Sequence, residues 1–283
     1  MALLTIVMAK KILFGGFVVV SSLSIAAIVF TLVVSFGVPV AALIFFAVRR
    51  KFSAAAAGAG AVVFLLFSLT LEGLLNFLLL RVNPATVAFF QNAWAYAIYG
   101  CLAAGVFEET GRLLAFKLVL KKQRSWEAGV SYGIGHGGIE AILLGGFTYL
   151  NNLVYALLIN SGAFDKLIAP SLTSQETLLL KSALAGTSAG TFAVAGLERV
   201  CAFLLQVALS LLVLYAVRNK KYLFWLLAVL IHAAVDFPVA LYQKAILGMW
   251  TVDAIVVLAA ILSVVFIIRS RAIFREPGER KPD

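Results

Sequence analysis

The chain contains two histidines, and each precedes an acidic residue by four positions. His136 precedes Glu140 in the segment GIGHGGIEA, and His232 precedes Asp236 in LIHAAVDF. Residues four apart lie on one face of an α-helix, so each pair can present both side chains together. An imidazole beside a carboxylate can bind a metal ion, hold a water molecule or transfer a proton. These two pairs are therefore candidates for a reactive site.

A third segment reads Glu108-Glu109-Thr110-Gly111-Arg112. On a helix, Arg112 can pair with Glu108 at a spacing of four or with Glu109 at a spacing of three. One cation cannot fully pair both acids, and the less paired acid is the better base. We expect Glu108 to be the base, by a slight preference, because Glu109 has the tighter spacing to Arg112. A buried ion pair that only fixes helix packing is the alternative.

All three segments lie within long apolar runs. Hydrophobic residues make up 63% of the 283 residues, charged residues 13%, and the mean hydropathy is +1.05. A soluble globular protein has about 25% charged residues. The composition therefore predicts an all-α, polytopic bundle of transmembrane helices. Ionisable groups inside a membrane cost roughly 2.5–3.5 kcal/mol each on insertion scales, so three helices that carry them predict a buried polar cavity.

Seven spans are expected, within a single domain that covers residues 1–283. They run from about 22–48, 54–80, 92–116, 127–150, 184–217, 222–243 and 250–268, and a charged tail follows at 269–283. The first apolar run is long enough for one span, kinked near Pro39, or for a tight two-helix hairpin. Lys10-Lys11 argue for an eighth span, so the bundle has seven or eight helices. Residues 160–182 are expected to be the only sizeable loop.

The formal net charge of +10 is concentrated in short loops and at the C-terminus. This distribution follows the positive-inside rule and not the pattern of a nucleic-acid-binding surface. We therefore expect a multi-pass protein of the cell membrane with a cytoplasmic C-terminus and no nucleic-acid partner. The basic segments are 49–51, 117–124, 218–221 and 269–281.

The ionisable groups share one depth. Glu108 lies 13 residues before Lys121, and His232 lies 11 residues after Lys221. Glu140 lies 13 residues after Glu127, at the start of its own span. At 1.5 Å per residue, each is roughly 16–20 Å from the basic boundary. Helices of alternating direction would thus bring these groups to one level, which predicts a single site.

Other polar and small residues have more structural interpretations. Tyr132 shares a face with His136 and Glu140, whereas a neighbouring stripe of small residues is expected to pack against another helix. Glu72, beside Asn76, and the pair Glu198-Arg199 are expected to support the site or the fold. The small-residue stripe consists of Gly129, Gly133, Gly137, Ala141 and Gly145.

Together the three motifs resemble the CAAX-protease and bacteriocin-processing superfamily of intramembrane proteases, which includes PrsW-like proteins. The nearest resemblance is to its YhfC-type branch of intramembrane metalloproteases, supported also by LEGLLN at 71–76 and ERVCAF at 198–203. The resemblance implies about eight helices around a membrane cavity open to the cytoplasm. It implies a catalytic set of Glu108, Glu109, Arg112, His136, Glu140, His232 and Asp236.

The resemblance also implies an activity. The expected function is an intramembrane endopeptidase, in which a glutamate activates water to hydrolyse a membrane-associated peptide or protein substrate. A zinc ion is an open alternative, with ligands drawn from His136, Glu140, His232 and Asp236. In the prenyl-protease branch the second motif ends in His, where this chain has Glu140, so cleavage of prenylated peptides does not follow. The competing functions are an ion- or proton-coupled transporter and a non-catalytic scaffold.

Overall fold

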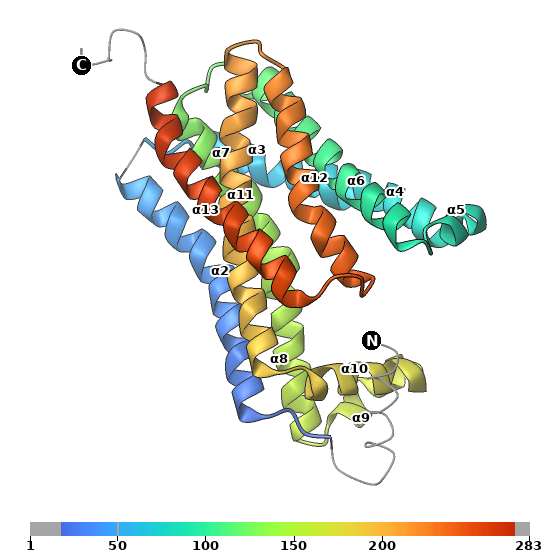
Figure 1. The fold of residues 1–283 in the computed structure, drawn as a ribbon. Helices are drawn as coiled ribbons and strands as arrows, with labels where there is room; N and C mark the ends of the chain where they lie inside the picture. Colours follow the sequence, from blue (N-terminus) through green and yellow to red (C-terminus); the bar gives the residue numbers. More distant parts are fainter. Residues whose placement is uncertain (1–17, 50, 275–283) are drawn as a thin grey trace. The chain divides into compact units, whose positions relative to one another are not determined.

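The computed structural model describes residues 18–49 and 51–274, and helices make up this part of the chain without any β-strand (Figure 1). Six helical segments are long and apolar enough to cross a membrane, which confirms an all-α, multi-pass membrane protein. They are Ser22–Arg49, Ala54–Val82, Trp126–Asn160, Ala189–Arg218, Leu223–Gln243 and Met249–Ile273. A further long helix, α6 (Ala93–Leu114), corresponds to the expected third span and carries the two adjacent glutamates.

The first described span is one continuous helix, α2 (Ser22–Arg49), with Pro39 inside it. The hairpin alternative is therefore wrong for this part of the chain. Proline removes one backbone hydrogen bond, a loss that transmembrane helices tolerate when their neighbours compensate. Lys10-Lys11 and the proposed eighth span lie outside the described residues.

Two spans change their helical winding along their length. Ala54–Val82 consists of α3 (Ala54–Val63), the π-helical η1 (Phe64–Glu72), α4 (Gly73–Phe77) and the π-helical η2 (Leu78–Val82). Trp126–Asn160 consists of α7 (Trp126–Glu140), the π-helical η4 (Ala141–Gly146) and α8 (Phe147–Asn160). A further π-helical segment, η3 (Ala115–Val119), extends α6. Such segments occur often at functional sites, and here they adjoin Glu72, Arg112 and Glu140.

The region expected to be a loop, residues 160–182, is partly helical. It contains α9 (Phe164–Leu167), the short 3-10 turn η5 (Ala169–Ser171) and the start of α10 (Ser174–Gly186). A capping box between Thr173 and Glu176 begins α10, because the two residues satisfy each other's exposed backbone donors. Helix α10 ends at Gly186 and a new helix begins at Ala189. The expected span 184–217 therefore starts at Ala189 and forms α11 (Ala189–Arg218). A short helix, α5 (Pro84–Phe89), also precedes α6.

The described residues form two compact units, of which the first comprises residues 18–37 and 141–200. Its described core contains Ile28, Ala156, Phe164 and Phe192. Asn160 ties the beginning of the described chain to α8, since its side chain both accepts from Val20 N and donates to Val20 O at 2.8 Å.

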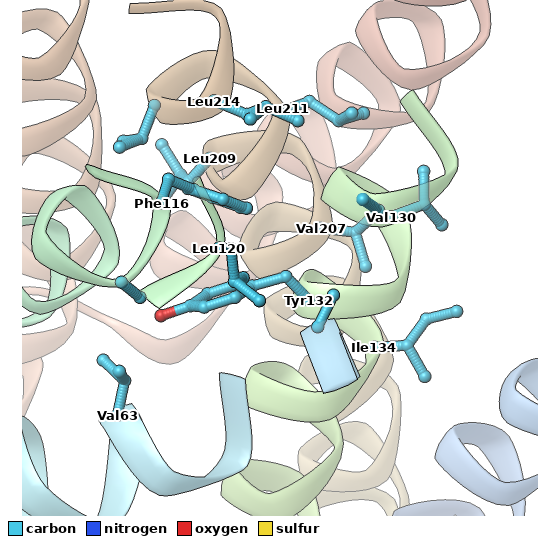
Figure 2. Packing of buried hydrophobic residues seen from close by; sticks show 14 of the residues in the cluster. Val63, Phe116, Leu120, Val130, Tyr132, Ile134, Val207, Leu209, Leu211 and Leu214 are labelled. Carbon is cyan, nitrogen blue, oxygen red and sulfur yellow. The ribbon is translucent and has the colours of Figure 1, made fainter. Parts of the chain in front are cut away.

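The second unit comprises residues 38–140 and 201–283, and all the principal ionisable residues of the three motifs belong to it. Figure 2 shows Tyr132 of α7 among apolar side chains that include Phe116 and Leu120. The Tyr132 and Phe116 rings lie 4.7 Å apart between centroids. This unit also contains α12 (Leu223–Gln243), which packs along α6, and α13 (Met249–Ile273), which packs on α12 (Figure 1).

Glycines allow α7 to lie close to two other helices. A Cβ at Gly135 would collide with Ala57 O of α3, and a Cβ at Gly133 would lie 2.6 Å from Val207 Cα of α11. The stripe predicted from Gly129, Gly133 and Gly137 therefore packs on α11, as expected for small residues at a spacing of four. A second close approach, through Gly135 to α3, completes the setting of α7 between α3 and α11.

Candidate active site

Three side chains from two helices form a compact, buried set. Glu108 of α6 and His136 and Glu140 of α7 each offer an oxygen or nitrogen atom, and these atoms all lie within 4.8 Å of one another. Glu108 Oε2 is 2.9 Å from His136 Nε2. His136 is fully buried, and the two carboxylates are nearly so. We call this set the Glu-His-Glu cluster.

A second set surrounds Arg112, and we call it the arginine cluster. Arg112 Nη1 donates to both oxygens of Glu109, at 2.6 and 2.7 Å. Glu109 Oε1 also lies 2.8 Å from His232 Nδ1, and His232 Nε2 lies 3.4 Å from Asp236 Oδ2. Glu109 and Arg112 are fully buried, whereas the Asp236 side chain is 40% exposed. The network therefore runs from a closed ion pair to an accessible carboxylate.

Arg112 is shared unequally between the two acids. Its Nη2 atom lies 4.0 Å from Glu108 Oε2, well beyond the distance of a hydrogen bond. The guanidinium is thus committed to Glu109, as the spacing of three residues favours. Glu108 instead lies against His136, so the two neighbouring glutamates have different environments.

Gln206 of α11 connects the two clusters and was not among the residues predicted from sequence. Its Oε1 accepts from Arg112 Nη2, and its Nε2 donates to Glu108 Oε2 at 3.0 Å and to Glu140 Oε2 at 2.8 Å. The oxygen and nitrogen positions of the amide follow from this network. A polar residue deep in the apolar segment CAFLLQVALS was the signal that could have revealed it.

The donor set fits a divalent metal such as zinc in number and type. Two carboxylates and one imidazole are three oxygen and nitrogen ligands, the number that a catalytic zinc site provides. The Gln206 amide group, with its partial positive charge, points at both carboxylates, which is the side where a cation would be attracted. His136 Nδ1 is buried without a hydrogen-bond partner among the described residues, whereas a ligating histidine usually has one.

The set differs in membership from the ligands expected from sequence. It includes Glu108, which was expected only as a base, along with His136 and Glu140. His232 and Asp236 lie in the arginine cluster instead, where His232 contacts Glu109. Both clusters are held within one unit of the fold, by α6, α7, α11 and α12.

The remaining polar residues that the sequence singled out do not belong to either cluster. Glu72 is buried and accepts a hydrogen bond of 3.1 Å from Asn76, whose Oδ1 accepts one of 2.6 Å from Tyr99. Glu198 and Arg199 belong to the first unit, where the Arg199 side chain lies close to Gly145. Tyr132 OH has no hydrogen-bond partner among the described residues, so its part in the site is packing against His136, with ring centroids 6.1 Å apart.

Comparison with known proteins gives an independent view of these residues. The chain is 38% identical over 245 residues to a protein of Bacillus subtilis (strain 168) described as "Uncharacterized membrane protein YhfC"; the match covers 86% of this chain and 94% of the relative. No solved structure matches the chain. The family described as YhfC intramembrane metalloprotease matches residues 33–257, a range that contains both buried clusters in full. The chain belongs to the family of YhfC intramembrane metalloproteases.

Proposed function

We propose that this protein is an endopeptidase that hydrolyses peptide bonds of membrane-associated substrates within the bilayer. The observation that carries the proposal is the buried Glu-His-Glu cluster beside the arginine cluster. Maintaining several ionisable groups in a transmembrane bundle is costly, and a site where water is activated gives a chemical reason for them. The family to which the chain belongs is named for this activity.

Glu108 is the group proposed to take a proton from the attacking water. Within the described residues, the contacts of Glu108 with His136, Gln206 and Arg112 all involve Oε2. Oε1 is therefore the oxygen placed to accept a proton. His136 and Gln206 hold the carboxylate in position, which a general base requires because proton transfer needs hydrogen-bond reach.

A bound zinc would be held by Glu108, His136 and Glu140. As a Lewis acid it would lower the pKa of a bound water to about 7 and polarise the peptide carbonyl. The protein's own contribution is to fix the three donors and to exclude bulk water.

His232 is proposed to move protons to and from the reacting peptide. It lies between Glu109 at 2.8 Å and Asp236 at 3.4 Å, and Asp236 is partly exposed. The ring can thus pass a proton between the buried interior and an accessible carboxylate. Hydrolysis would begin when the water loses a proton to Glu108. It would be completed when His232 donates a proton to the leaving amine.

Incubation with tagged single-span substrates tests the activity. Purified protein in lipid nanodiscs is expected to cleave at least one member of a substrate panel, and Glu108→Gln is expected to abolish this cleavage. Glu127→Gln is the matched control, since it makes the same change at the beginning of α7, away from both clusters. Equal cleavage by wild type and by separate Glu108→Gln and Glu109→Gln variants would end the proposal.

One observation favours a proton-coupled transporter as a second candidate. Glu109, His232 and Asp236 form a continuous series of titratable contacts that ends at an exposed carboxylate. Such series also serve as proton relays in transporters. Reconstituted liposomes with a pH gradient distinguish the two functions, because a protease without coupled transport leaves the proton leak unchanged.

The orientation in the membrane is part of the proposal. Basic loops at 120–124 and 218–221 favour the cytoplasm, and so does the C-terminal segment. Single cysteines at Ser125 and Ser171, in a background without the native thiols, are expected to react from opposite sides of the membrane. Both positions are exposed, so labelling from the same side would contradict this topology.

A further inference from the structure

A polar pocket lies beside the arginine cluster, with a volume of about 290 Å³. Three segments of one unit enclose it: the second half of Ala54–Val82, the first turns of α6 and the last turns of α12. Asp236, which contacts His232, forms part of its wall. The pocket therefore adjoins the proposed reaction site. Its polar lining consists of Glu72, Asn76, Tyr96, Tyr99, Asp236 and Gln243.

The inner part of this pocket is acidic. Glu72 and Asp236 both line it. Among the described residues, no lysine or arginine forms an ion pair with Glu72, and the ion pair of Asp236 is with His232. Two carboxylates therefore line this pocket, and among the described residues neither forms an ion pair with a lysine or arginine.

Directed hydrogen bonds fix one of these carboxylates. Tyr99 OH donates to Asn76 Oδ1 at 2.6 Å, and Asn76 Nδ2 donates to Glu72 Oε1 at 3.1 Å. The series holds Glu72 in place while using only one of its oxygens. Polar side chains that are positioned by neighbours in this way are typical of binding sites.

The outer end of the pocket has a cation of its own, Lys244. Its Nζ atom lies 4.1 Å from the centroid of the Tyr96 ring and 3.4 Å from Phe90 O. Lys244 directly follows Gln243 at the end of α12, and it is not one of the residues that line the pocket. The Tyr96 ring, which lines the pocket, thus already has one cation over its face.

The pocket also lies towards one particular end of the helices. It is lined by the beginning of α6 and the end of α12, which lead to the segments 83–92 and 244–248. Those two segments contain a single basic residue, Lys244, whereas the segments at the opposite ends contain Lys121, Lys122, Lys220 and Lys221. By the positive-inside rule, the pocket faces the non-cytoplasmic side. The resemblance to intramembrane proteases implied a cavity open to the cytoplasm instead.

We propose that this pocket is a recognition site, reached from the non-cytoplasmic side, for a basic side chain of the substrate. The inference rests on the proposed peptidase function for its substrate, but the acidity and accessibility of the pocket are independent of catalysis. A lysine or arginine side chain provides a cation for Glu72 close to Asp236, and it brings the attached peptide next to His232.

Thiol modification tests the pocket without any need for cleavage. Gly100 lines it, and a Cβ at Gly100 would meet no atom within 4 Å, so Gly100→Cys fits the structure. With Cys101 and Cys201 replaced by serine, the probes are methanethiosulfonates that carry a trimethylammonium or a sulfonate group. Right-side-out and inside-out vesicles give the side of access. The exposed Ser171→Cys gives the reference ratio of cationic to anionic rates.

The expected result is modification of Gly100→Cys from the non-cytoplasmic side. The ratio of the cationic to the anionic modification rate at Gly100→Cys should exceed the reference ratio at Ser171→Cys by at least about 10-fold, because an acidic cleft concentrates cations. Glu72→Gln should lower this preference. High salt should also lower it in the protein that retains Glu72, and this second measurement decides the point if the Glu72→Gln protein does not fold. A ratio equal to the reference overturns the cation site, and access only from the cytoplasmic side overturns the direction of entry.

Peptide selectivity then tests the link to proteolysis. Paired substrates that differ only in lysine against norleucine near the cleaved bond are expected to differ at least about 10-fold in kcat/KM, and Glu72→Gln should reduce that ratio. If wild type cleaves no substrate, the proposed function fails while the thiol result still decides the pocket. If cleavage occurs with equal kcat/KM for both substrates, the recognition site fails and the peptidase stands.

Discussion

The two buried clusters contain similar residues but differ in how their charges are balanced. In the arginine cluster, Glu109 receives two short hydrogen bonds from Arg112 and a third contact from His232. In the Glu-His-Glu cluster, both carboxylates accept from the Gln206 amide, Glu108 also contacts His136, and Arg112 Nη2 is 4.0 Å from Glu108 Oε2. Glu109 is thus bonded directly to a guanidinium, whereas the Arg112 guanidinium lies beyond hydrogen-bond distance of Glu108.

We propose that this difference separates the roles of the two glutamates of α6, with Glu109 supporting the site and Glu108 acting as the base. A fully paired buried carboxylate has little tendency to bind a metal or a proton, because either would compete with the arginine. A carboxylate that no arginine hydrogen-bonds directly, such as Glu108, is more available for both. Gln206 hydrogen-bonds to residues of both clusters. The Glu109–Arg112 ion pair can therefore hold the geometry of the Glu-His-Glu cluster without itself taking the proton from water.

The largest difference between the clusters should appear in the two glutamates of α6. Glu108→Gln keeps the size of the side chain but removes the base, so cleavage should fall by about 10²–10⁴-fold. The melting temperature should change little. Glu109→Gln should reverse the pattern and lower stability first, because it deprives Arg112 of its ion-pair partner. Cleavage rates and thermal unfolding of both variants, measured in the same nanodiscs, decide this prediction; equal effects on both quantities would remove the distinction.

Arg112→Ala should be the most damaging change to stability. It leaves the buried Glu109 carboxylate without its directly bonded cation, and breaking a buried ion pair in this way costs about 3–5 kcal/mol. Expression and the midpoint of thermal unfolding should both fall. Arg271→Ala, at an exposed arginine that stacks on Trp126, serves as the control and should have a much smaller effect. A stable Arg112→Ala protein would show that the arginine cluster does not hold the frame.

Zinc affinity should depend on the Glu-His-Glu cluster alone. His136→Gln and Glu140→Gln each alter one of the three proposed ligands and should weaken zinc binding by more than about 100-fold, beyond the loss expected for an outer partner. Glu127→Gln should leave it unchanged. Zinc bound per chain, measured by elemental analysis after titration and dialysis, tests the set. Retained affinity in both ligand variants would place the metal elsewhere.

Asp236→Asn should have a smaller effect than the changes at Glu108, Arg112 or the proposed zinc ligands. Asp236 contacts His232 only at 3.4 Å, so its replacement should lower kcat by about 10-fold through poorer orientation of the ring. Zinc content and melting temperature should remain at the wild-type values, since Asp236 lies outside the Glu-His-Glu cluster. A loss of bound zinc would instead make Asp236 a ligand, as the sequence had allowed.

Several features of the site follow from local sequence. The composition requires helices in a membrane, because a lipid-embedded backbone must satisfy its own hydrogen bonds. The spacing of three residues between Glu109 and Arg112 favours their ion pair, and the glycine stripe of α7 predicts a close helix contact. Each of these depends on residues within a few turns of one helix, where the α-helical period alone sets which side chains meet.

Other features depend on which helices meet. The contacts of His136 with Glu108, of His232 with Glu109 and of Gln206 with both carboxylates join residues 28, 123 and 66–98 positions apart. No local period relates such residues. The break at Thr187 was also missed, because the apolar pattern continues through it.

The sequence by itself determined that the chain is an all-α membrane protein, and it predicted that its polar groups share one depth. Only the tertiary structure decided that Glu108, and not His232, joins His136 and Glu140. The physical reason is the close approach at Gly133 and Gly135, which lets α7 lie between α3 and α11 at backbone contact. That position brings Gln206 to both carboxylates and leaves His232 of α12 to Glu109, so the partition into two clusters results from helix packing.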